Sequence, residues 1–372
     1  MAPSGARRLA SEGSLARDLP VPSGWFAVAA GSELTTGAVR AARVGPEEMV
    51  VWRGPDGRAV ASSPWCPHLG AHLGHVGRVV DGQLECGFHG FRFGSDGRCV
   101  ATGYGGRRPH VALGSFPVAE VNDAVFVWYH PSGAPPTWVL PELCQPGWTG
   151  VSWSRLEIGG HPLEVTENSV DLGHFRYIHG YDSVSSVEPA TTDGPVLRAR
   201  YSMSTRRRIG PAALPAIHTE FDVGVHGLGF STVDLHIRSL ATRMRLFVLA
   251  TPLEPGRVEV RLGTTARYRP EGRLPIGLAA LPDRWRARVV RDFTSLQLRG
   301  DVGQDRVVWE TKRRLSQPLV VAGDGPIMLY RRWSRQFFPT TAVTDGADDD
   351  TLAATAVAAG TEAGDDTPGI SG

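Results

Sequence analysis

Two short segments in the first third of the chain each combine one cysteine with one histidine. They read Cys66-Pro-His68 and Cys86-Gly-Phe-His89, and 17 residues separate them. Thiolates and imidazoles are both ligands of transition metals, and two such segments on neighbouring loops supply two ligands of each kind. A [2Fe–2S] cluster with one iron on two cysteines and the other on two histidines needs this ligand set, which raises its reduction potential above that of an all-cysteine cluster. The pattern predicts a one-electron carrier.

A structural zinc site is the alternative interpretation of these four residues. Zinc fingers usually group their ligands by type, with two cysteines close together and two histidines close together. The two mixed pairs of this chain disfavour that grouping. The flanking glycines favour the cluster, because tight turns let backbone N–H groups approach the sulfur atoms. These glycines are Gly70, Gly74, Gly77, Gly87 and Gly90.

A second group of candidate ligands lies in the middle of the chain. Asp171, His174 and His179 follow the pattern Asp-x₂-His-x₄-His. On a helix Asp171 and His174 share a face, but His174 and His179 differ in direction by about 140°, so the helix has to loosen or end before both imidazoles can reach one metal. The spacing also disfavours a zinc-protease helix, whose histidines are four residues apart. Two histidines and one carboxylate leave open positions on iron(II), which suits oxygen chemistry.

The carboxylate of this second site has to come from elsewhere in the chain. Our choice is Asp305, in the segment Gly303-Gln-Asp305, because it follows an expected long helix whose end the fold can bring back to the sheet. From the spacing alone, Asp301 and Glu310 compete with it.

The elements that position these residues are mostly strands. Residues 24–131 alternate short β-rich runs with turn dipeptides such as Asp81-Gly82, which predicts a small antiparallel β domain. Residues 132–150 are rich in proline and glycine and form a predicted linker. Residues 151–340 predict a larger antiparallel sheet with a helix at about Leu163–His179 and a long helix at Leu281–Leu298. Residues 1–23 are a predicted extension, and residues 341–372 are a predicted disordered acidic tail.

Alternating runs define the expected strands of the larger sheet, and apolar positions at helical spacing define the face of the long helix that should close it. The expected strands are Ser152–Ile158, Val196–Arg207, Glu220–Phe230, Arg243–Thr251 and Arg257–Tyr268. The apolar positions of the helix are Leu281, Trp285, Val289, Phe293 and Leu296.

Composition excludes several classes of protein. The chain has 39 basic and 38 acidic side chains, so its formal net charge of +1 provides no field that would attract nucleic acid or an anionic membrane. Lys312 is the single lysine, which we attribute to composition bias. Four cysteines in 372 residues cannot form a disulfide framework and indicate a reducing compartment. No apolar run suits a membrane span or a signal peptide, so we expect a cytoplasmic protein without a membrane anchor.

The two ligand groups together resemble those of the Rieske non-haem iron oxygenases. The cluster segments are similar to the family's Rieske motif, Asn168–His179 is similar to its iron motif, and Gln304-Asp305 is similar to its third-ligand segment. This resemblance favours Asp305 as the carboxylate. It implies an α+β fold, with an N-terminal all-β Rieske [2Fe–2S] domain followed by a helix-grip, START-like catalytic domain built on an antiparallel sheet. His72, His75, Cys99 and Cys144 match no ligand position and are interpreted as bystanders.

The resemblance also implies the terminal oxygenase of a multicomponent system. Electrons from NAD(P)H would arrive through a separate reductase or ferredoxin, and the chain has no Gly-x-Gly-x-x-Gly nucleotide motif of its own. In the family, subunits form a ring in which an aspartate lies between one subunit's cluster and the next subunit's iron. Asp171 holds that position, so it should hydrogen-bond His174 and His89 of the partner subunit. Asn168 and Asp171 are the predicted catalytic residues, and a homotrimer is the predicted assembly.

The C-terminal segments starting at Trp309 look similar to the branch of 3-ketosteroid 9α-hydroxylase oxygenase, cholesterol 7-desaturase and aminopyrrolnitrin oxygenase. This implies monooxygenation of a bulky apolar substrate, such as a steroid or a specialised metabolite. Oxidative cyclisation, desaturation and N-oxygenation are alternatives. A pure electron-transfer Rieske protein and an iron-free lipid-binding protein are two other classes. Iron content separates them, because these classes require about three, two and no iron atoms per chain, respectively.

Overall fold

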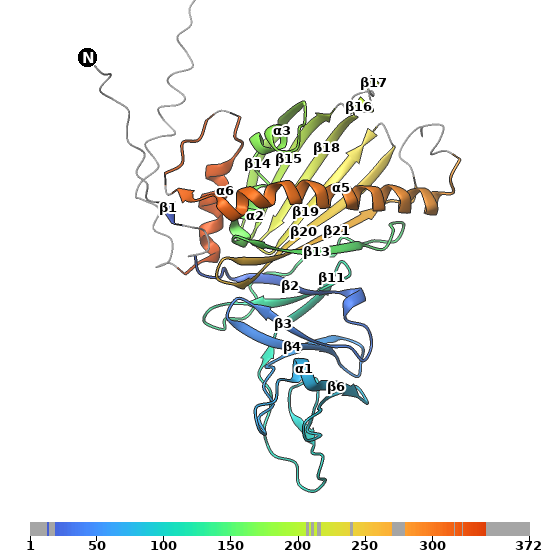
Figure 1. Ribbon diagram of the computed structural model, residues 1–372, viewed down its shortest axis with the longest axis vertical. Coiled ribbons are helices and arrows are strands. Elements are labelled where there is room, and N and C mark those ends of the chain that lie inside the picture. The colour runs from blue at the N-terminus through green and yellow to red at the C-terminus, as the bar shows by residue number, and fades with distance from the viewer. Residues whose placement is uncertain are drawn as a thin grey trace, which may run out of the picture.

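The computed structural model describes residues 13–14, 19–205, 208–209, 212–213, 217–238, 241–269, 280–315, 317–321 and 323–339. The predicted tail, residues 341–372, and most of the predicted extension, residues 1–23, lie outside these ranges. Figure 1 shows an elongated molecule, with a small β unit at one end and a large sheet crossed by a long helix at the other.

The small β unit contains three antiparallel sheets with the strand orders β10-β5-β4-β3, β11-β12-β2 and β6-β7-β8-β9. Its strands are β2 Gly24–Ala30, β3 Val39–Val44, β4 Glu47–Arg53, β5 Ala59–Ser62, β6 Gly77–Val80, β7 Gln83–Cys86, β8 Arg92–Phe93, β9 Cys99–Ala101, β10 Ser115–Phe116, β11 Val118–Val121 and β12 Ala124–Tyr129, and its helices are the 3-10 turn η2 Gly31–Glu33 and α1 Leu73–Val76. Asp81 and Gly82 both have positive φ, so they close the β6–β7 hairpin with the turn that suits twisted strands. A core that includes Trp52, Leu84 and Phe93 packs behind the cysteine loops.

The large sheet has seven antiparallel strands in the order β13-β21-β20-β19-β18-β15-β14. These strands are β13 Ser152–Gly159, β14 Ser183–Asp193, β15 Val196–Thr205, β18 Ile217–His226, β19 Phe230–Ile237, β20 Thr242–Glu254 and β21 Arg257–Ala266. Two further sheets have two strands each. One pairs β1 Gly13–Ser14 with β22 Arg314–Leu315, and the other pairs β16 Arg208–Ile209 with β17 Ala212–Ala213. Strands β13 and β14 are consecutive in the large sheet's sequence order but occupy its opposite edges, so the chain between them crosses the sheet.

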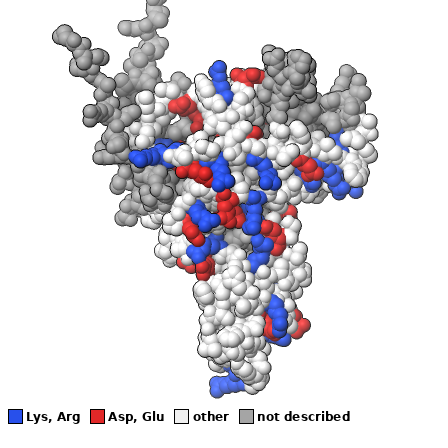
Figure 2. Space-filling model, viewed as in Figure 1, with Lys and Arg blue, Asp and Glu red and all other residues white. Residues whose placement is uncertain are grey.

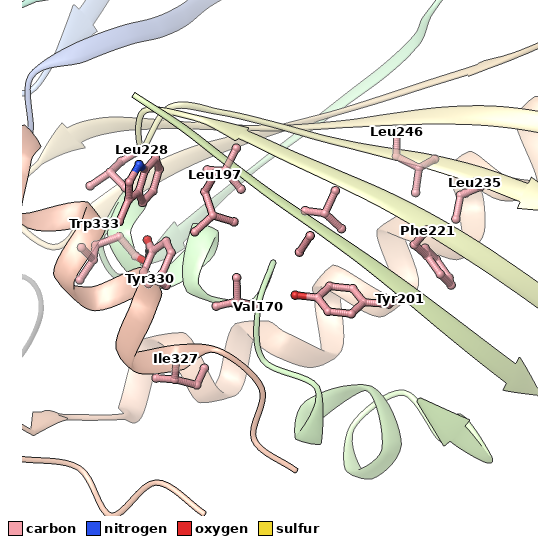
Figure 3. Packing of buried hydrophobic residues seen from close by; sticks show 14 of the residues in the cluster. Val170, Leu197, Tyr201, Phe221, Leu228, Leu235, Leu246, Ile327, Tyr330 and Trp333 are labelled. Atoms are coloured by element: carbon pink, nitrogen blue, oxygen red, sulfur yellow. Dashed lines mark hydrogen bonds between the residues drawn. The ribbon is translucent and has the colours of Figure 1, made fainter. Parts of the chain in front are cut away.

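The crossing segment and the C-terminal helices cover one face of the sheet (Figure 1). The helices are α2 Pro162–Glu167, α3 Gly173–Tyr177, α5 Asp283–Thr311, α6 Ile327–Ser334 and the 3-10 turn η4 Arg335–Phe337. Figure 3 shows Leu197 and Tyr201 of the sheet on the same side as Tyr330 and Trp333 of α6, and all four are buried. Each such buried apolar side chain stabilises the fold by about 1.5–3 kcal/mol. The predicted α+β architecture is confirmed.

The helix expected at Leu163–His179 is instead two short helices. After α2 the N–H groups of Ser169 and Val170 bond to carbonyls three residues back, and the N–H of Leu172 bonds to the carbonyl of Asp324. These bonds turn the chain out of the helical path before α3 begins. His174 and His179 could not reach one metal from a continuous helix, and this break confirms the expected loosening of the helix in this segment.

The long helix is correct in position but differs from the prediction in length and in face. Helix α5 continues to Thr311, so Asp305 lies within it and not after it. Its buried face carries Ala287, Val302, Asp305 and Trp309. The five apolar positions expected to close the sheet are exposed, with exposed fractions from 38% at Leu281 to 67% at Leu296. No described helix is long and apolar enough to cross a bilayer.

Candidate metal centres

The two cysteine loops have the same backbone construction. In each loop the cysteine carbonyl accepts a hydrogen bond of 2.9 Å from the N–H of the glycine four residues later, which is Gly70 after Cys66 and Gly90 after Cys86. Both glycines have positive φ, near 70°, a region that side chains with a Cβ rarely adopt. The flanking glycines therefore allow two matching tight turns, which direct the cysteine and histidine side chains of both loops toward the same place.

The four predicted cluster ligands meet between these loops. Cys66 and Cys86 are buried, and the rings of His68 and His89 have centroids 4.7 Å apart. Nδ1 of His68 is buried without a hydrogen-bond partner among the described residues. Burial raises the pKa of the Cys66 thiol; the backbone N–H of His68 opposes this rise and the neighbouring Cys86 adds to it. Two close thiols and an unpartnered imidazole nitrogen fit a shared metal cluster, which would use all of them as ligands.

The second predicted group converges across three elements. His174 lies on α3, His179 lies just beyond it, and Asp305 lies on α5. Their ligand atoms all lie within 4.8 Å of one another, and the three side chains are 7%, 5% and 7% exposed. Among the described residues, neither Asp301 nor Glu310 belongs to this group.

Hydrogen bonds aim both imidazoles in a way that suits a metal. Nδ1 of His174 lies 2.6 Å from the carbonyl oxygen of Asp171, and Nδ1 of His179 lies 3.0 Å from Oε1 of Gln304. A carbonyl oxygen only accepts, so each Nδ1 carries a proton, and Nε2 is the ring nitrogen left for a metal. Metal-binding histidines are commonly oriented in this manner. Gln304 was predicted only as part of the third-ligand segment, but it also orients His179. Its position beside Asp305 in the sequence was the signal that could have indicated this role.

The carboxylate completes the fit. Oδ1 of Asp305 is buried without a hydrogen bond and lies 3.4 Å from Nε2 of His179. Burial lowers the pKa of His179, but the nearby Asp305 carboxylate and Gln304 outweigh this and raise it, so the site favours a positive charge between the ring and the carboxylate. A metal cation would supply that charge, and two imidazoles and one carboxylate are the ligand set of non-haem iron(II) sites with open positions. Glu310, by contrast, accepts hydrogen bonds from Gly159 and Arg306.

Of the two predicted catalytic residues, Asp171 contacts a member of this group and Asn168 contacts α5. Oδ1 of Asp171 accepts the backbone N–H of His174 at 3.2 Å and lies 3.8 Å from Nδ1 of that ring. The ring proton is directed to the Asp171 carbonyl and not to its carboxylate, so the carboxylate, 35% exposed, is available on the outer side. Burial opposes ionisation of Asp171, but its contacts with His174 outweigh this and lower its pKa. Asn168 lies farther along, where its Oδ1 is 3.4 Å from Nε1 of Trp309 on α5.

Two family descriptions match the chain. Residues 24–115 match the Rieske [2Fe-2S] domain, and residues 127–338, more than half of the chain, match the 3-ketosteroid 9alpha-hydroxylase C-terminal domain. The chain belongs to the Rieske oxygenases. This confirms the family inferred from the ligand segments, and it supports a Rieske cluster and a non-haem iron as the cofactors.

Relatives of this oxygenase extend over most of its length. Cholesterol 7-desaturase nvd 1 of Ciona intestinalis is 29% identical over 86% of this chain and 70% of its own length. A probable 3-ketosteroid-9-alpha-monooxygenase oxygenase component of Rhodococcus rhodochrous is 28% identical over 78% of this chain and 73% of its own. The crystal structure of dicamba monooxygenase bound to dicamba has the same fold, with a TM-score of 0.66, 20% identity and coverage of 86% of this chain and 98% of that one. The protein is an oxidoreductase.

A buried ionic cluster connects α2 of the oxygenase to the end of α5. We call Glu164, Glu167 and Lys312 the α2–α5 clamp. Nζ of Lys312 lies 3.7 Å from Oε1 of Glu164 and 3.6 Å from Oε1 of Glu167. Burial raises the pKa of Glu164 to about 7, although Lys312 opposes the rise. Burial also opposes ionisation of Glu167, but hydrogen bonds from Arg331 and the nearby Lys312 outweigh it, so the pKa of Glu167 lies below its usual value.

The raised pKa of Glu164 predicts that the oxygenase loses stability as the pH rises. The folded state holds the proton more tightly than the unfolded state, whose carboxyl titrates near 4.5, so the loss develops between about pH 4.5 and 7 and amounts to at most about 3 kcal/mol. Glu164→Gln should remove most of this pH dependence. Urea unfolding at pH 5.5 and pH 8 measures it, and an equal pH dependence in wild type and variant would contradict the assignment.

The remaining cysteines and nearby histidines of the oxygenase lie outside both centres. Cys99 is buried and its Sγ contacts the carbonyl of Ala101 at 3.4 Å. Burial raises the pKa of Cys144 to about 11, so it remains a thiol. The rings of His72 and His75 contact each other at a tilt, with centroids 4.4 Å apart, and line a cavity of about 340 Å³ between the β unit and the large sheet. Figure 2 shows basic and acidic side chains interspersed over this junction.

Proposed function

We propose that this oxygenase oxidises a bulky apolar substrate by monooxygenation, with electrons supplied from NAD(P)H by a separate reductase or ferredoxin. The [2Fe–2S] cluster would be held by Cys66, His68, Cys86 and His89, and would accept one electron at a time. The iron(II) would be held by His174, His179 and Asp305, and would supply the oxygen chemistry. The observation that carries the proposal is the convergence of these three ligand atoms within 4.8 Å, on a chain that also carries the cluster loops.

The proposed substrate class is steroid-like or a specialised metabolite of similar bulk. One group of relatives is named for cholesterol desaturation and another for monooxygenation of 3-ketosteroids. The face of the sheet beneath α5 and α6 is lined by apolar side chains such as Phe221 and Leu246, which favours an apolar ligand over a charged one. Desaturation, for which one group of relatives is named, is an alternative outcome at the same site, as are oxidative cyclisation and N-oxygenation.

The arrangement of the two centres supports electron transfer between subunits. Helix α1, which follows the first cluster loop, and helix α3, which carries His174, lie at opposite ends of the molecule (Figure 1). We propose that the cluster of one chain serves the iron of the next in a homotrimer, with Asp171 hydrogen-bonded to His89 of the partner subunit. Exposed apolar side chains surround the cluster loops, as expected for a docking surface. These are Trp65, Leu69, Phe88 and Tyr104, which are 51%, 65%, 59% and 69% exposed.

The trimer has a direct measurement. Light scattering on the holoprotein should give three times the mass of the chain. Leu69→Ser combined with Phe88→Ser should shift the distribution toward monomer and lower product formation, because both substitutions remove apolar contact area at the proposed interface. A monomeric wild type with full activity would contradict the proposal.

The proposed reaction is tested by incubating the iron-replete protein with a surrogate ferredoxin and reductase, NADH and ¹⁸O₂. The substrates would be a panel of 3-ketosteroids, cholesterol and aromatic amines. We expect NADH oxidation that depends on one substrate and a product that carries one ¹⁸O atom, from a protein that holds about three iron atoms per chain. About two iron atoms and no product would instead indicate an electron carrier, and no iron would indicate a binding protein.

A further inference from the structure

The single lysine of the chain occupies an unusual position. The other members of the 39 basic side chains are arginines, so composition alone would place an arginine at position 312. Lys312 instead lies in the α2–α5 clamp, between the carboxylates of Glu164 and Glu167, which are residues only 3% and 7% exposed. The one position at which the chain uses lysine instead of arginine is therefore the position that contacts two buried carboxylates.

The geometry explains why an ammonium suits this position. Glu164 and Glu167 are three residues apart on α2 and present their carboxylates side by side, and Nζ of Lys312 is nearly equidistant from both at 3.7 and 3.6 Å. A compact ammonium can serve two acceptors at once, whereas a planar guanidinium prefers to bind one carboxylate with two parallel bonds. Arg331 already binds Glu167 in that way, with distances of 2.8 and 3.3 Å.

The clamp joins the two segments that carry the proposed iron ligands. The chain that leaves α2 passes through Asn168 and Asp171 to the two histidines. Lys312 lies at the C-terminus of α5, where its N–H bonds to the carbonyl of Val308. A second contact joins the same two segments, because Nε1 of Trp309 on α5 donates to Oδ1 of Asn168 at 3.4 Å. Fixing α2 against the end of α5 therefore fixes the histidine segment relative to the helix that carries Asp305.

We propose that Lys312 is a positioning residue of the mononuclear iron site, which acts by holding α2 and the C-terminal end of α5 in register so that the two imidazoles and the carboxylate meet. The inference rests on the proposed ligands and adds a residue that does not touch the metal. It predicts that loss of the ammonium loosens the metal site while the cluster, in the other part of the molecule, is unaffected.

The test compares Lys312→Met with Arg313→Met, which removes the adjacent exposed cation. The measurement is retention of mononuclear iron in anaerobic competition with a chelator, with the visible absorption of the cluster as an internal reference. Lys312→Met should lower the apparent iron affinity by about tenfold or more, as substitutions of groups that orient metal ligands do, and Arg313→Met should not. Protein reconstituted with Co²⁺ provides a second readout, because its visible spectrum should change in the first variant only.

A folding defect in Lys312→Met is separable from the inference. The double variant Glu164→Gln with Lys312→Met removes one acid and one base together, and Glu167 keeps its hydrogen bonds from Arg331 and its electrostatic attraction to Arg314. It should fold and still show lowered iron affinity and an altered Co²⁺ spectrum. Wild-type affinity and spectrum in the double variant would overturn the inference, even if its thermal stability fell. A wild type that holds only about two iron atoms per chain would instead defeat the proposed function.

Discussion

Replacing Asp305 with alanine is expected to remove the mononuclear iron and reduce product formation to background, while the cluster remains. Asp305 is the only carboxylate in the three-residue group found among the described residues, and its Oδ1 is buried without a hydrogen bond. Without it, two neutral imidazoles would have to hold a dication with no compensating negative charge. Iron analysis should fall from about three to about two atoms per chain, and the cluster absorption should be unchanged.

Glu310→Ala is the matched control for this substitution. It removes a carboxylate from the same helix, but one that binds Arg306 and the N–H of Gly159 and not the two histidines. We expect wild-type iron content and activity. Loss of iron in Glu310→Ala together with retention in Asp305→Ala would show that the ligand assignment is wrong.

Replacing Asp171 with asparagine is expected to leave both metals in place and to abolish coupled turnover. Asparagine keeps an oxygen that can accept the backbone N–H of His174, so the iron ligand should stay oriented. It removes the negative charge from the outer side of the site, where the carboxylate is 35% exposed and is proposed to meet His89 of the partner subunit. The chemistry would thus lose its electron supply and not its metal.

Metal content and single-turnover product formation separate a loss of electron supply from a loss of metal. Iron content and reduction of the cluster by dithionite should match the wild type, whereas product per cluster oxidised in a single turnover should fall to near zero. Asp182→Asn, a change of an exposed carboxylate beyond α3, should behave as the wild type does. Normal product formation in Asp171→Asn would exclude the bridging role.

The local parts of both centres could be predicted from the sequence, because each ligand pair lies within one short segment. The cluster ligands and the two iron histidines depend on spacing and on turns that glycine permits. Asp305 is different, since it lies more than a hundred residues from His179 and spacing left Asp301 and Glu310 open. The expected end of the long helix favoured Asp305, although that helix in fact continues past it, and the resemblance to a family supported the same choice.

The errors have physical causes. Trp285 and Phe293 have helical spacing, so they predicted a helix face that packs on the sheet, but both side chains are exposed. The spacing of apolar residues shows that they share one face of a helix, and does not show what that face packs against. Helix α5 passes through Gly300 and Gly303 because its buried side chains on either side hold it to the sheet. Strand β14 was missed because it is an exposed edge strand rich in serine and threonine, without apolar alternation. The α2–α5 clamp depends on a tertiary contact that no local pattern reveals.

The crossing of the sheet between β13 and β14 also sets an order of assembly. The predicted cluster ligands span a short stretch near the N-terminus, and all of them lie in the small β unit. The iron ligands need the crossing segment, the far-edge strand and finally α5, which is among the last elements to leave the ribosome. Contacts this distant in sequence form late, since the chain between them must first be ordered. The proposed cluster ligands are therefore all present early in synthesis, whereas the proposed iron ligands are all present only after α5 has been made.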